Sequence, residues 1–192
     1  MKYFQIEVLG EENDDYCFSN NSPSKIGDYK LMVGKSLKKE YPSDPFEITL
    51  ELDEDAPGLV CASFLGNTKS FLMMKQEAAD VILKHNIKKI EVYSFTLLDH
   101  EKKIHSKEYV FVNPLGTFDC LNMELSDYDR ATSGKILGFN EFVLDKNKMK
   151  IAPDLFRPQE DDSAYFFSEK LVNALAEEGF TNFEFEELQT GR

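Results

Sequence analysis

Two stretches of this chain share one order of predicted elements: a short strand, an amphipathic helix and a second strand. The first stretch opens on the apolar run Phe71–Met74 and continues with apolar residues at helical spacing between Ala78 and Ile82. It closes on the segment 87–98, where apolar and polar residues alternate as in a half-buried strand. Such a unit buries its apolar surface only when the helix covers one face of a sheet.

The second stretch has clearer helix boundaries. Tyr165–Phe167 is predicted as a strand, and Ser168 suits the N-cap of the following helix. Gly179 is predicted to end this helix, as Asn86 is predicted to end the first one, and the segment 180–188 then alternates. A shift of 93 positions aligns the two stretches without a gap, although the match is one of residue class rather than identity.

Further alternating segments predict that the sheets are mainly antiparallel. Residues 2–9 and 46–52 are predicted strands, and 99–102 is a predicted hairpin turn that leads into the strand 103–112. We therefore expect an α+β fold with mainly antiparallel sheets, helices packed on one face, and two similar strand–helix–strand lobes.

At 192 residues the chain is long enough for one well-buried core, so we expect four regions in one compact unit. They are an N-terminal strand and loop region (1–45), a first strand–helix–strand lobe (46–98), a hairpin and connecting block (99–138) and a second strand–helix–strand lobe (139–192). Because any two amphipathic units of this kind align in part, true duplication and chance similarity stay open as alternatives.

The chain is strongly acidic. It carries 22 Lys and Arg against 35 Asp and Glu, which gives a net charge of −13 at pH 7. A surface of this sign repels phosphate groups, so we expect neither nucleic acid nor an anionic membrane as a partner. The same charge speeds association with a basic protein, although it also serves solubility alone.

The three cysteines, Cys17, Cys61 and Cys120, stand at wide and unpatterned spacing. This spacing argues against a disulfide framework and against a CxxC metal site, and each thiol is explained as a small buried apolar residue. The N-terminal segment lacks the apolar core of a signal peptide, and no apolar run approaches the roughly 18 residues of a membrane span. We therefore expect a reduced, cytoplasmic compartment.

The familiar motifs of catalysis and cofactor binding are missing from the sequence. Gly34–Ser36 resembles the end of a P-loop, but Tyr29 occupies the position of its first glycine. The histidines His85, His100 and His105 form no pair at the helical spacing of metal ligands, and there is no GxSxG sequence. We expect no catalytic residue, no metal site and no cofactor.

Asp127–Arg130 is the compact polar group that combines both charge signs. It is a candidate site, and a helix that starts after Ser126 explains it equally well. Paired carboxylates of the glycosidase type cannot be singled out, because 35 acids give many chance pairs.

Several segments between Lys88 and the C-terminus follow one another in a characteristic order. Phe118–Tyr128 is similar to the pattern vDciDxexSxY, and the closing unit is similar to vSexlkxal…GxxF. The chain thereby resembles immunity protein family eleven of bacterial polymorphic toxin systems. It departs from that family at Asn122, where an acid is usual, and at Thr181-Asn182, where Thr-Gly is usual. The other matching segments are Ile90–Tyr93, Tyr109–Asn113, Phe142–Asp145, Leu155–Arg157 and Phe167–Phe185.

The resemblance implies a protein that is not an enzyme and that neutralises a cognate toxin by occlusion. Many such toxins act on nucleic acids or nucleotides through basic clefts, and an acidic protein suits such a cleft. The residues that follow the family pattern could either hold the fold or contact the partner; they are Asp119, Ser126, Tyr128, Phe156 and Arg157.

Under this hypothesis two acidic loops and two tyrosines are candidate contacts to the toxin. They are Asp53, Glu54 and Asp55, then Glu160, Asp161 and Asp162, with Tyr16 and Tyr165 as aromatic anchors. The loops do not match a calcium-binding loop, and they are otherwise explained as solvent-facing turns. The alternative functions are a small-molecule-binding protein or enzyme that uses an inter-lobe cleft, and a scaffold that assembles with itself.

Overall fold

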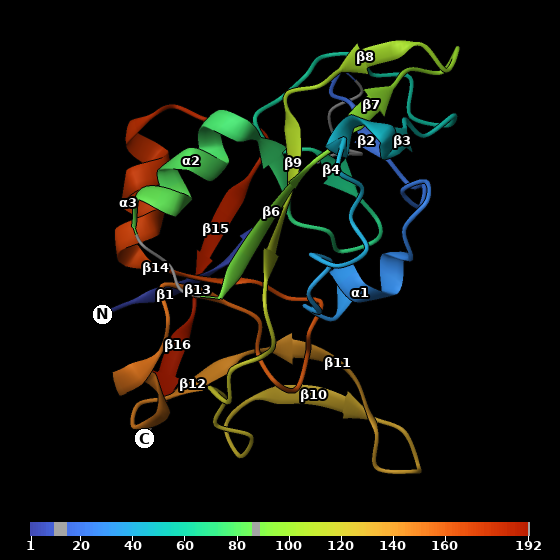
Figure 1. The fold of residues 1–192 in the computed structure, drawn as a ribbon. Helices are drawn as coiled ribbons and strands as arrows, with labels where there is room; N and C mark the ends of the chain where they lie inside the picture. Colours follow the sequence, from blue (N-terminus) through green and yellow to red (C-terminus); the bar gives the residue numbers. More distant parts are fainter. Residues whose placement is uncertain (10–14, 86–88, 192) are drawn as a thin grey trace.

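The structure is a computed structural model, and it describes residues 1–9, 15–85 and 89–191 (Figure 1). Its helices are few and short and its sheets are mostly antiparallel, which confirms the α+β class expected from the sequence. Within the described residues, none of these helices is long and apolar enough to span a bilayer. The helices are α1 (Asp28–Met32), α2 (Gln76–Lys84) and α3 (Glu169–Glu177), with the 3-10 turns η1 (Pro45–Glu47) and η2 (Lys148–Ile151).

The first predicted strand–helix–strand stretch forms a sheet of three strands. These are β5 (Met73–Lys75), β6 (Ile90–Ser94) and β9 (Tyr109–Pro114), and β9 lies in the middle, antiparallel to both neighbours. Helix α2 connects β5 to β6 and covers the sheet with its apolar stripe, as the helical spacing predicts. Asn86, the predicted end of this helix, lies outside the described residues. The stripe consists of Ala78, Ala79, Val81 and Ile82.

The second stretch forms a four-stranded sheet of the order β13-β14-β1-β15. Helix α3 begins after Ser168, whose Oγ accepts a hydrogen bond from the Leu171 amide at 3.4 Å, and Gly179 follows its end at φ 70°. Both predicted helix boundaries are therefore confirmed. The strands are β1 (Tyr3–Glu7), β13 (Leu155–Phe156), β14 (Phe166–Ser168) and β15 (Glu184–Glu187).

The opening strand and the helix of the two units have the same lengths and the same spacing along the chain, but the two sheets have different strand topologies. Strands β5 and β14, and helices α2 and α3, begin and end 93 positions apart. The middle strand comes from different places, because β9 follows β6 through a hairpin while β1 is the N-terminal strand. Whether the units are a true duplication stays a prediction.

One core is shared by both units. Figure 1 shows α2 and α3 side by side, and the two helices are in contact. Because this core draws on residues from both ends of the chain, the boundaries of the two predicted lobes stay a prediction. Its buried members include Ile6, Phe64, Leu72, Met74, Ala78, Ile82, Val110, Phe167, Leu171 and Leu175.

A second core lies under a small sheet of the order β3-β7-β8. Strand β7 pairs antiparallel with β8 across the turn at 99–102, and β6 pairs antiparallel with β9, as the hairpin prediction requires. Strand β3 is an exception to the antiparallel rule, because it pairs parallel with β7. The strands around this core are β2 (Phe18–Ser19), β3 (Thr49–Glu51), β4 (Gly66–Asn67), β7 (Thr96–Leu98) and β8 (Ile104–Ser106).

A third core lies beneath β10, β11 and β12. The prediction of a helix start after Ser126 is wrong, because Asp127–Arg130 is strand β10 and pairs antiparallel with β11. The alternation explains it: Tyr128 packs on the ring of Phe139, while the charged neighbours of Tyr128 are exposed. The strands are β10 (Asp127–Arg130), β11 (Ile136–Glu141), β12 (Val143–Asp145) and β16 (Gln189–Gly191).

Candidate functional site

The first acidic loop packs as an ordered turn against the β7–β8 hairpin. The Asp53 Oδ1 atom accepts a hydrogen bond from the Asp55 amide at 2.8 Å, and the ring Nε2 of His100 lies 3.0 Å from the Asp53 carbonyl oxygen. Asp53 is half-buried, whereas Glu54 and Asp55 are exposed. Only Glu54 and Asp55 therefore present carboxylates freely to a partner.

The second acidic loop lies between β13 and β14, and its three acids are half-buried. Asp161 uses its Oδ1 atom to accept a hydrogen bond from the Ser163 amide at 3.0 Å, and Asp162 offers its carbonyl oxygen to Arg157. The Oε2 atom of Glu160 is buried without a hydrogen-bond partner among the described residues, and burial raises the pKa of this carboxyl. This loop is turned toward the protein more than toward solvent.

The two candidate tyrosines differ in exposure. Tyr16 is half-buried and forms a parallel bridge with Val60, so part of its ring faces solvent. Tyr165 is only 6% exposed, and its hydroxyl donates to the Ser70 carbonyl at 2.8 Å and accepts from the Leu72 amide at 3.2 Å. The choice of Tyr165 as an aromatic anchor is wrong, because the ring is part of the shared core.

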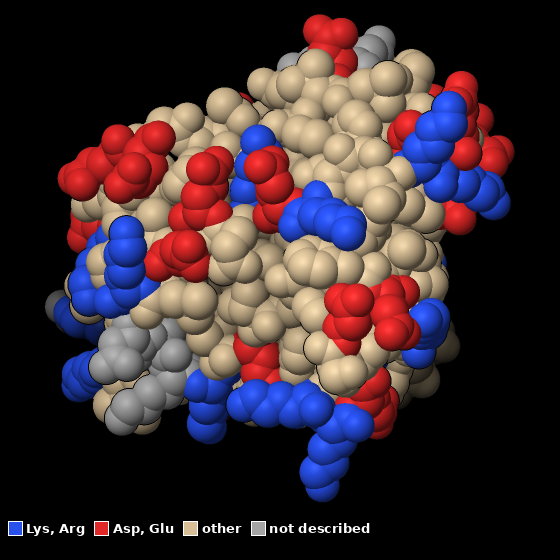
Figure 2. All heavy atoms as spheres, turned by 45° about the horizontal axis from the view of Figure 1, so that its top comes forward, with Lys and Arg blue, Asp and Glu red and all other residues tan. Residues whose placement is uncertain are grey.

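On the face that Figure 2 shows, acidic side chains do not form one continuous field. Figure 2 shows one face of the molecule, on which Asp and Glu side chains stand in several separate groups, with Lys and Arg beside some of them. Ion pairs between surface residues include Lys103 with Glu101 and Lys102 with Glu51. Surface pairs of this kind contribute little stability, but they reduce the local negative potential.

A cavity of about 210 Å³ lies between β1, β11 and β15, and its lining includes Glu7, Glu141, Glu186 and Glu187. The cross-strand pairs Gln5 with Glu186 and Glu7 with Glu184 place these side chains on one face of the sheet. Strand β15 is an edge strand of that sheet, and its glutamates are exposed. We call Glu7, Glu141, Glu184 and Glu186 the β15 acidic face; Glu7, Glu141 and Glu186 line the cavity together with Phe139 and Phe142.

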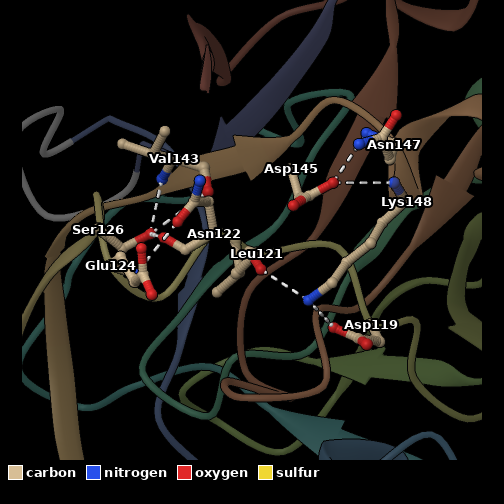
Figure 3. A network of polar contacts seen from close by, with 9 residues as sticks. All are labelled: Asp119, Leu121, Asn122, Glu124, Ser126, Val143, Asp145, Asn147 and Lys148. Carbon is tan, nitrogen blue, oxygen red and sulfur yellow. Dashed lines mark hydrogen bonds and ion pairs between the residues drawn. The ribbon is translucent and has the colours of Figure 1, made fainter. Parts of the chain in front are cut away.

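Polar groups of the block Phe118–Tyr128 form a hydrogen-bond network that anchors strand β12 (Figure 3). The Ser126 hydroxyl accepts a hydrogen bond from the Val143 amide at 3.0 Å and donates to the Asn122 carbonyl at 2.9 Å. The Oδ1 atom of Asn122 accepts a hydrogen bond from the Glu124 amide at 3.1 Å. The carboxylate that is usual at this position could accept the same hydrogen bond. The departure from the family pattern at Asn122 therefore preserves the turn.

A second part of the same network joins this block to the turn after β12. Lys148 donates through Nζ to Asp119 Oδ1 at 2.6 Å and to the Leu121 carbonyl at 2.9 Å (Figure 3). Asp145 Oδ1 accepts the amides of Asn147 and Lys148 at 2.7 and 3.0 Å, and these bonds lower the pKa of the Asp145 carboxyl. Asp119 and Ser126 thus hold the fold.

Arg157 is buried at 1% exposure and is held by backbone carbonyls. Its Nη1 donates to the Met32 and Asp162 carbonyls at 3.0 and 2.6 Å, and its Nη2 donates to the Leu31 carbonyl at 2.7 Å. The guanidinium carbon lies 4.2 Å from the centre of the Tyr165 ring. This residue of the family pattern connects distant segments inside the molecule and offers nothing to a partner.

The P-loop-like segment Gly34–Ser36 faces a carboxylate. Glu91, only 5% exposed, accepts hydrogen bonds from the Ser36 hydroxyl at 2.8 Å and from the Leu37 amide at 3.3 Å. These donors lower the pKa of Glu91 against the opposing effect of burial. A phosphate would be repelled by this carboxylate, so the segment does not form a phosphate site.

Three residues that the sequence did not connect meet near β2. Cys17, Cys61 and His105 place one sulfur or nitrogen atom each within 4.8 Å of one another. A hydrogen bond from Cys17 lowers the pKa of Cys61, and the same bond raises the pKa of Cys17. The interpretation of each cysteine as a small buried apolar residue is wrong for Cys61, because Cys61 is half-buried. Positions 44 residues apart give no motif, so no local signal could have found this cluster.

Comparison with known proteins gives one family. The model of the immunity protein family Imm11 matches residues 7–190 of the chain, which is nearly its whole length. No curated protein matches the chain.

Proposed function

Because this chain belongs to the immunity protein family Imm11, we propose that it binds a cognate bacterial toxin and neutralises it by occlusion. The family match over residues 7–190 is the observation that carries the proposal. Occlusion needs a complementary surface and no reactive group, so the protein acts by binding and not by catalysis.

The partner surface in this proposal is basic. A net charge of −13 gives the protein an attractive field for such a surface and a repulsive one for nucleic acid. Complementary charges of this kind accelerate the encounter of two proteins more than they strengthen the final complex. The proposal therefore concerns the rate of capture first and the affinity second.

The β15 acidic face is the surface that we place against the toxin. Its four glutamates are exposed, and the described residues that line the cavity include no lysine or arginine; Glu187, which also lines it, pairs with Lys2 at 2.8 Å. The cavity is large enough to admit a long cationic side chain, and Phe139 and Phe142 on its wall supply apolar contacts to the aliphatic part of that side chain. The open edge of β15 adds backbone groups that a partner strand can pair with.

The acidic loop at residues 53–55 is the second candidate contact surface. Glu54 and Asp55 are exposed, and the Asp53 amide donates to the Phe18 carbonyl at 2.9 Å, two residues after the half-buried Tyr16. The loop at 160–162 contributes less in this proposal, because its carboxylates are half-buried and two of its residues are engaged within the protein. Tyr165 is not part of the interface, because it is buried.

The proposed function is tested by co-expression with the product of the neighbouring gene. We expect that product to kill cells when expressed alone, and we expect this chain to restore growth and to co-purify with it. A toxic neighbour that this chain neither restrains nor binds would contradict the proposal.

The contact surface is tested by pairs of charge reversals. Glu184→Lys with Glu186→Lys should slow association with the toxin by about tenfold or more at low salt, and the difference should shrink as salt is added. Glu54→Lys with Asp55→Lys tests the loop in the same way. Glu177→Lys with Glu178→Lys is the matched control, since both residues are exposed at the end of α3 and belong to neither surface. Equal association rates in all three double variants would remove both surfaces from the interface.

A further inference from the structure

Three separate segments bring Cys17, Cys61 and His105 together. Tyr16 and Val60 form a parallel bridge, and the Cys17 amide donates to the Val60 carbonyl at 3.0 Å, so the two residues that follow, Cys17 and Cys61, lie side by side. His105 reaches the same place from the middle of β8. The backbone pairing thus fixes two thiols next to each other, and the hairpin adds an imidazole.

The geometry suits a tetrahedral metal ion. The Cys17 sulfur lies 3.4 Å from the His105 Nε2 atom, and all three ligand atoms fall within 4.8 Å of one another. Ligand atoms around a zinc ion at its usual bond lengths stand about 3.5–3.8 Å apart, so small side-chain rotations are enough to complete the site.

The surroundings also suit an ion. Cys17 is buried at 1% exposure, while Cys61 and His105 are half-buried, so the site is shielded on one side and reachable from the other. Two sulfur ligands and one imidazole favour a soft or borderline ion over calcium or magnesium, which require oxygen ligands.

We propose that Cys17, Cys61 and His105 bind a Zn²⁺ ion, with a fourth position left for water or for a ligand from a partner. Binding through Nε2 moves the imidazole proton to Nδ1 and replaces the present 3.0 Å contact between Nε2 and the Leu59 carbonyl. The thiol protons of the two cysteines are released to solvent as the metal–sulfur bonds form. The ion links the segment before β2, the segment around Cys61 and the β7–β8 hairpin.

The consequence for the surface is local. Leu59, Val60 and Ile104 are exposed beside the cluster, at 51%, 51% and 63%. A metal ion that links their two segments would hold this apolar group in one arrangement, in addition to the Tyr16–Val60 bridge and the contact of His105 with the Leu59 carbonyl. This site shares no residue with the β15 acidic face, whereas Cys17 directly follows Tyr16 of the second candidate contact surface.

The test is a titration of the reduced, metal-free full-length protein with Co²⁺. We expect one ion per chain, with the thiolate-to-cobalt charge-transfer band and the visible spectrum of tetrahedral Co²⁺, and we expect Zn²⁺ to displace it. Binding without a charge-transfer band would place the ion on surface carboxylates and overturn the proposal, as would a Cys17–Cys61 disulfide that persists under reductant and excludes Co²⁺.

Variants locate the site. His105→Gln and Cys61→Ser alter half-buried residues, so both should fold, and each should weaken Co²⁺ binding by at least about tenfold. His100→Gln is the matched control in the same hairpin, and Cys120→Ala is the matched control for a thiol in another core. Zn²⁺ should raise the melting temperature of the wild type and of both controls but not of His105→Gln. An unchanged Co²⁺ affinity together with an undiminished charge-transfer band in Cys61→Ser would overturn the proposal.

Discussion

Glu160 is an acid whose surroundings disfavour its charge. One carboxylate oxygen is buried without a hydrogen-bond partner among the described residues, and Asp119 lies close enough to add a like charge. Burial is the larger of these effects, and both raise the pKa of the carboxyl in the folded state. Charge at this residue therefore works against folding at neutral pH.

We expect Glu160→Gln to raise the free energy of unfolding at pH 7. A raised folded-state pKa means that the folded protein holds the proton more tightly than the unfolded chain, so the wild type gains relative stability as pH falls. The gap between variant and wild type should close below the ordinary Glu pKa of 4.5, where the carboxyl is protonated in both states. Urea unfolding of both proteins at a series of pH values measures this gap; a gap that widens toward low pH would contradict the expectation.

The residue scale shows what a motif search can and cannot recover. Ser168 and Gly179 were recognised because capping depends on residues next to each other in the chain. The local sequence does not reveal that Tyr165 is buried, because its burial depends on α2, β5 and Arg157. The surroundings of Cys61 are equally hidden from the local sequence, since Cys17 and His105 come from other parts of the chain.

At the scale of elements, one loop after α1 depends on a single glycine. Gly34 has φ 63°, and a Cβ atom there would stand 2.6 Å from the Pro114 carbonyl oxygen. Its own carbonyl accepts a hydrogen bond from the Gly116 amide at 2.9 Å, so the loop lies directly against the end of β9. Both the left-handed conformation and the close approach require glycine.

We expect Gly34→Ala to lower the free energy of unfolding by about 2 kcal/mol or more, because it adds a backbone clash to the cost of a left-handed alanine. Gly116→Ala is the matched control: φ there is 71°, but a Cβ atom would meet nothing within 4 Å. That control should lose only about 1 kcal/mol. Denaturant unfolding gives both values, and equal losses would mean that the contact with Pro114 imposes no strain.

The elements themselves were predictable to different degrees. Helices α2 and α3 and the β7–β8 hairpin follow from periodicity and turn residues, which act locally. Strand β10 did not, because Ser126 resembles a helix cap and its hydroxyl is instead used by Val143, 17 residues away. A capping residue predicts a helix only when no other backbone group competes for its side chain.

At the scale of the whole molecule, Arg157 joins parts that the sequence keeps far apart. It binds the carbonyls of Leu31 and Met32 in α1 and that of Asp162 beyond β13, and its guanidinium covers Tyr165 in the shared core. Leu31 belongs to the second core and Tyr165 to the shared one. The residue therefore couples two cores through hydrogen bonds to charged nitrogen atoms.

Replacing Arg157 by methionine keeps much of the volume and removes all three hydrogen bonds. We expect Arg157→Met to lower the free energy of unfolding by about 2–4 kcal/mol, because three carbonyls lose their buried donors. Arg130→Met is the matched control, since Arg130 is exposed and contacts only Tyr128 among the interactions described; it should change stability by about 0.5 kcal/mol or less. Chemical denaturation followed by fluorescence and circular dichroism measures both, and a loss no larger than the control's would show that Arg157 is dispensable.

The sequence alone determined helices α2 and α3, the β7–β8 hairpin, the α+β class and the family, because periodicity, capping and segment order are local and one-dimensional properties. The tertiary structure decided which strand lies in the middle of each sheet, which acids are free, and which thiols meet an imidazole. Those outcomes depend on contacts between residues far apart in the chain, such as Gln5 with Glu186 and Cys17 with His105. Burial and charge at such contacts are set by the packed neighbours, which no single segment specifies.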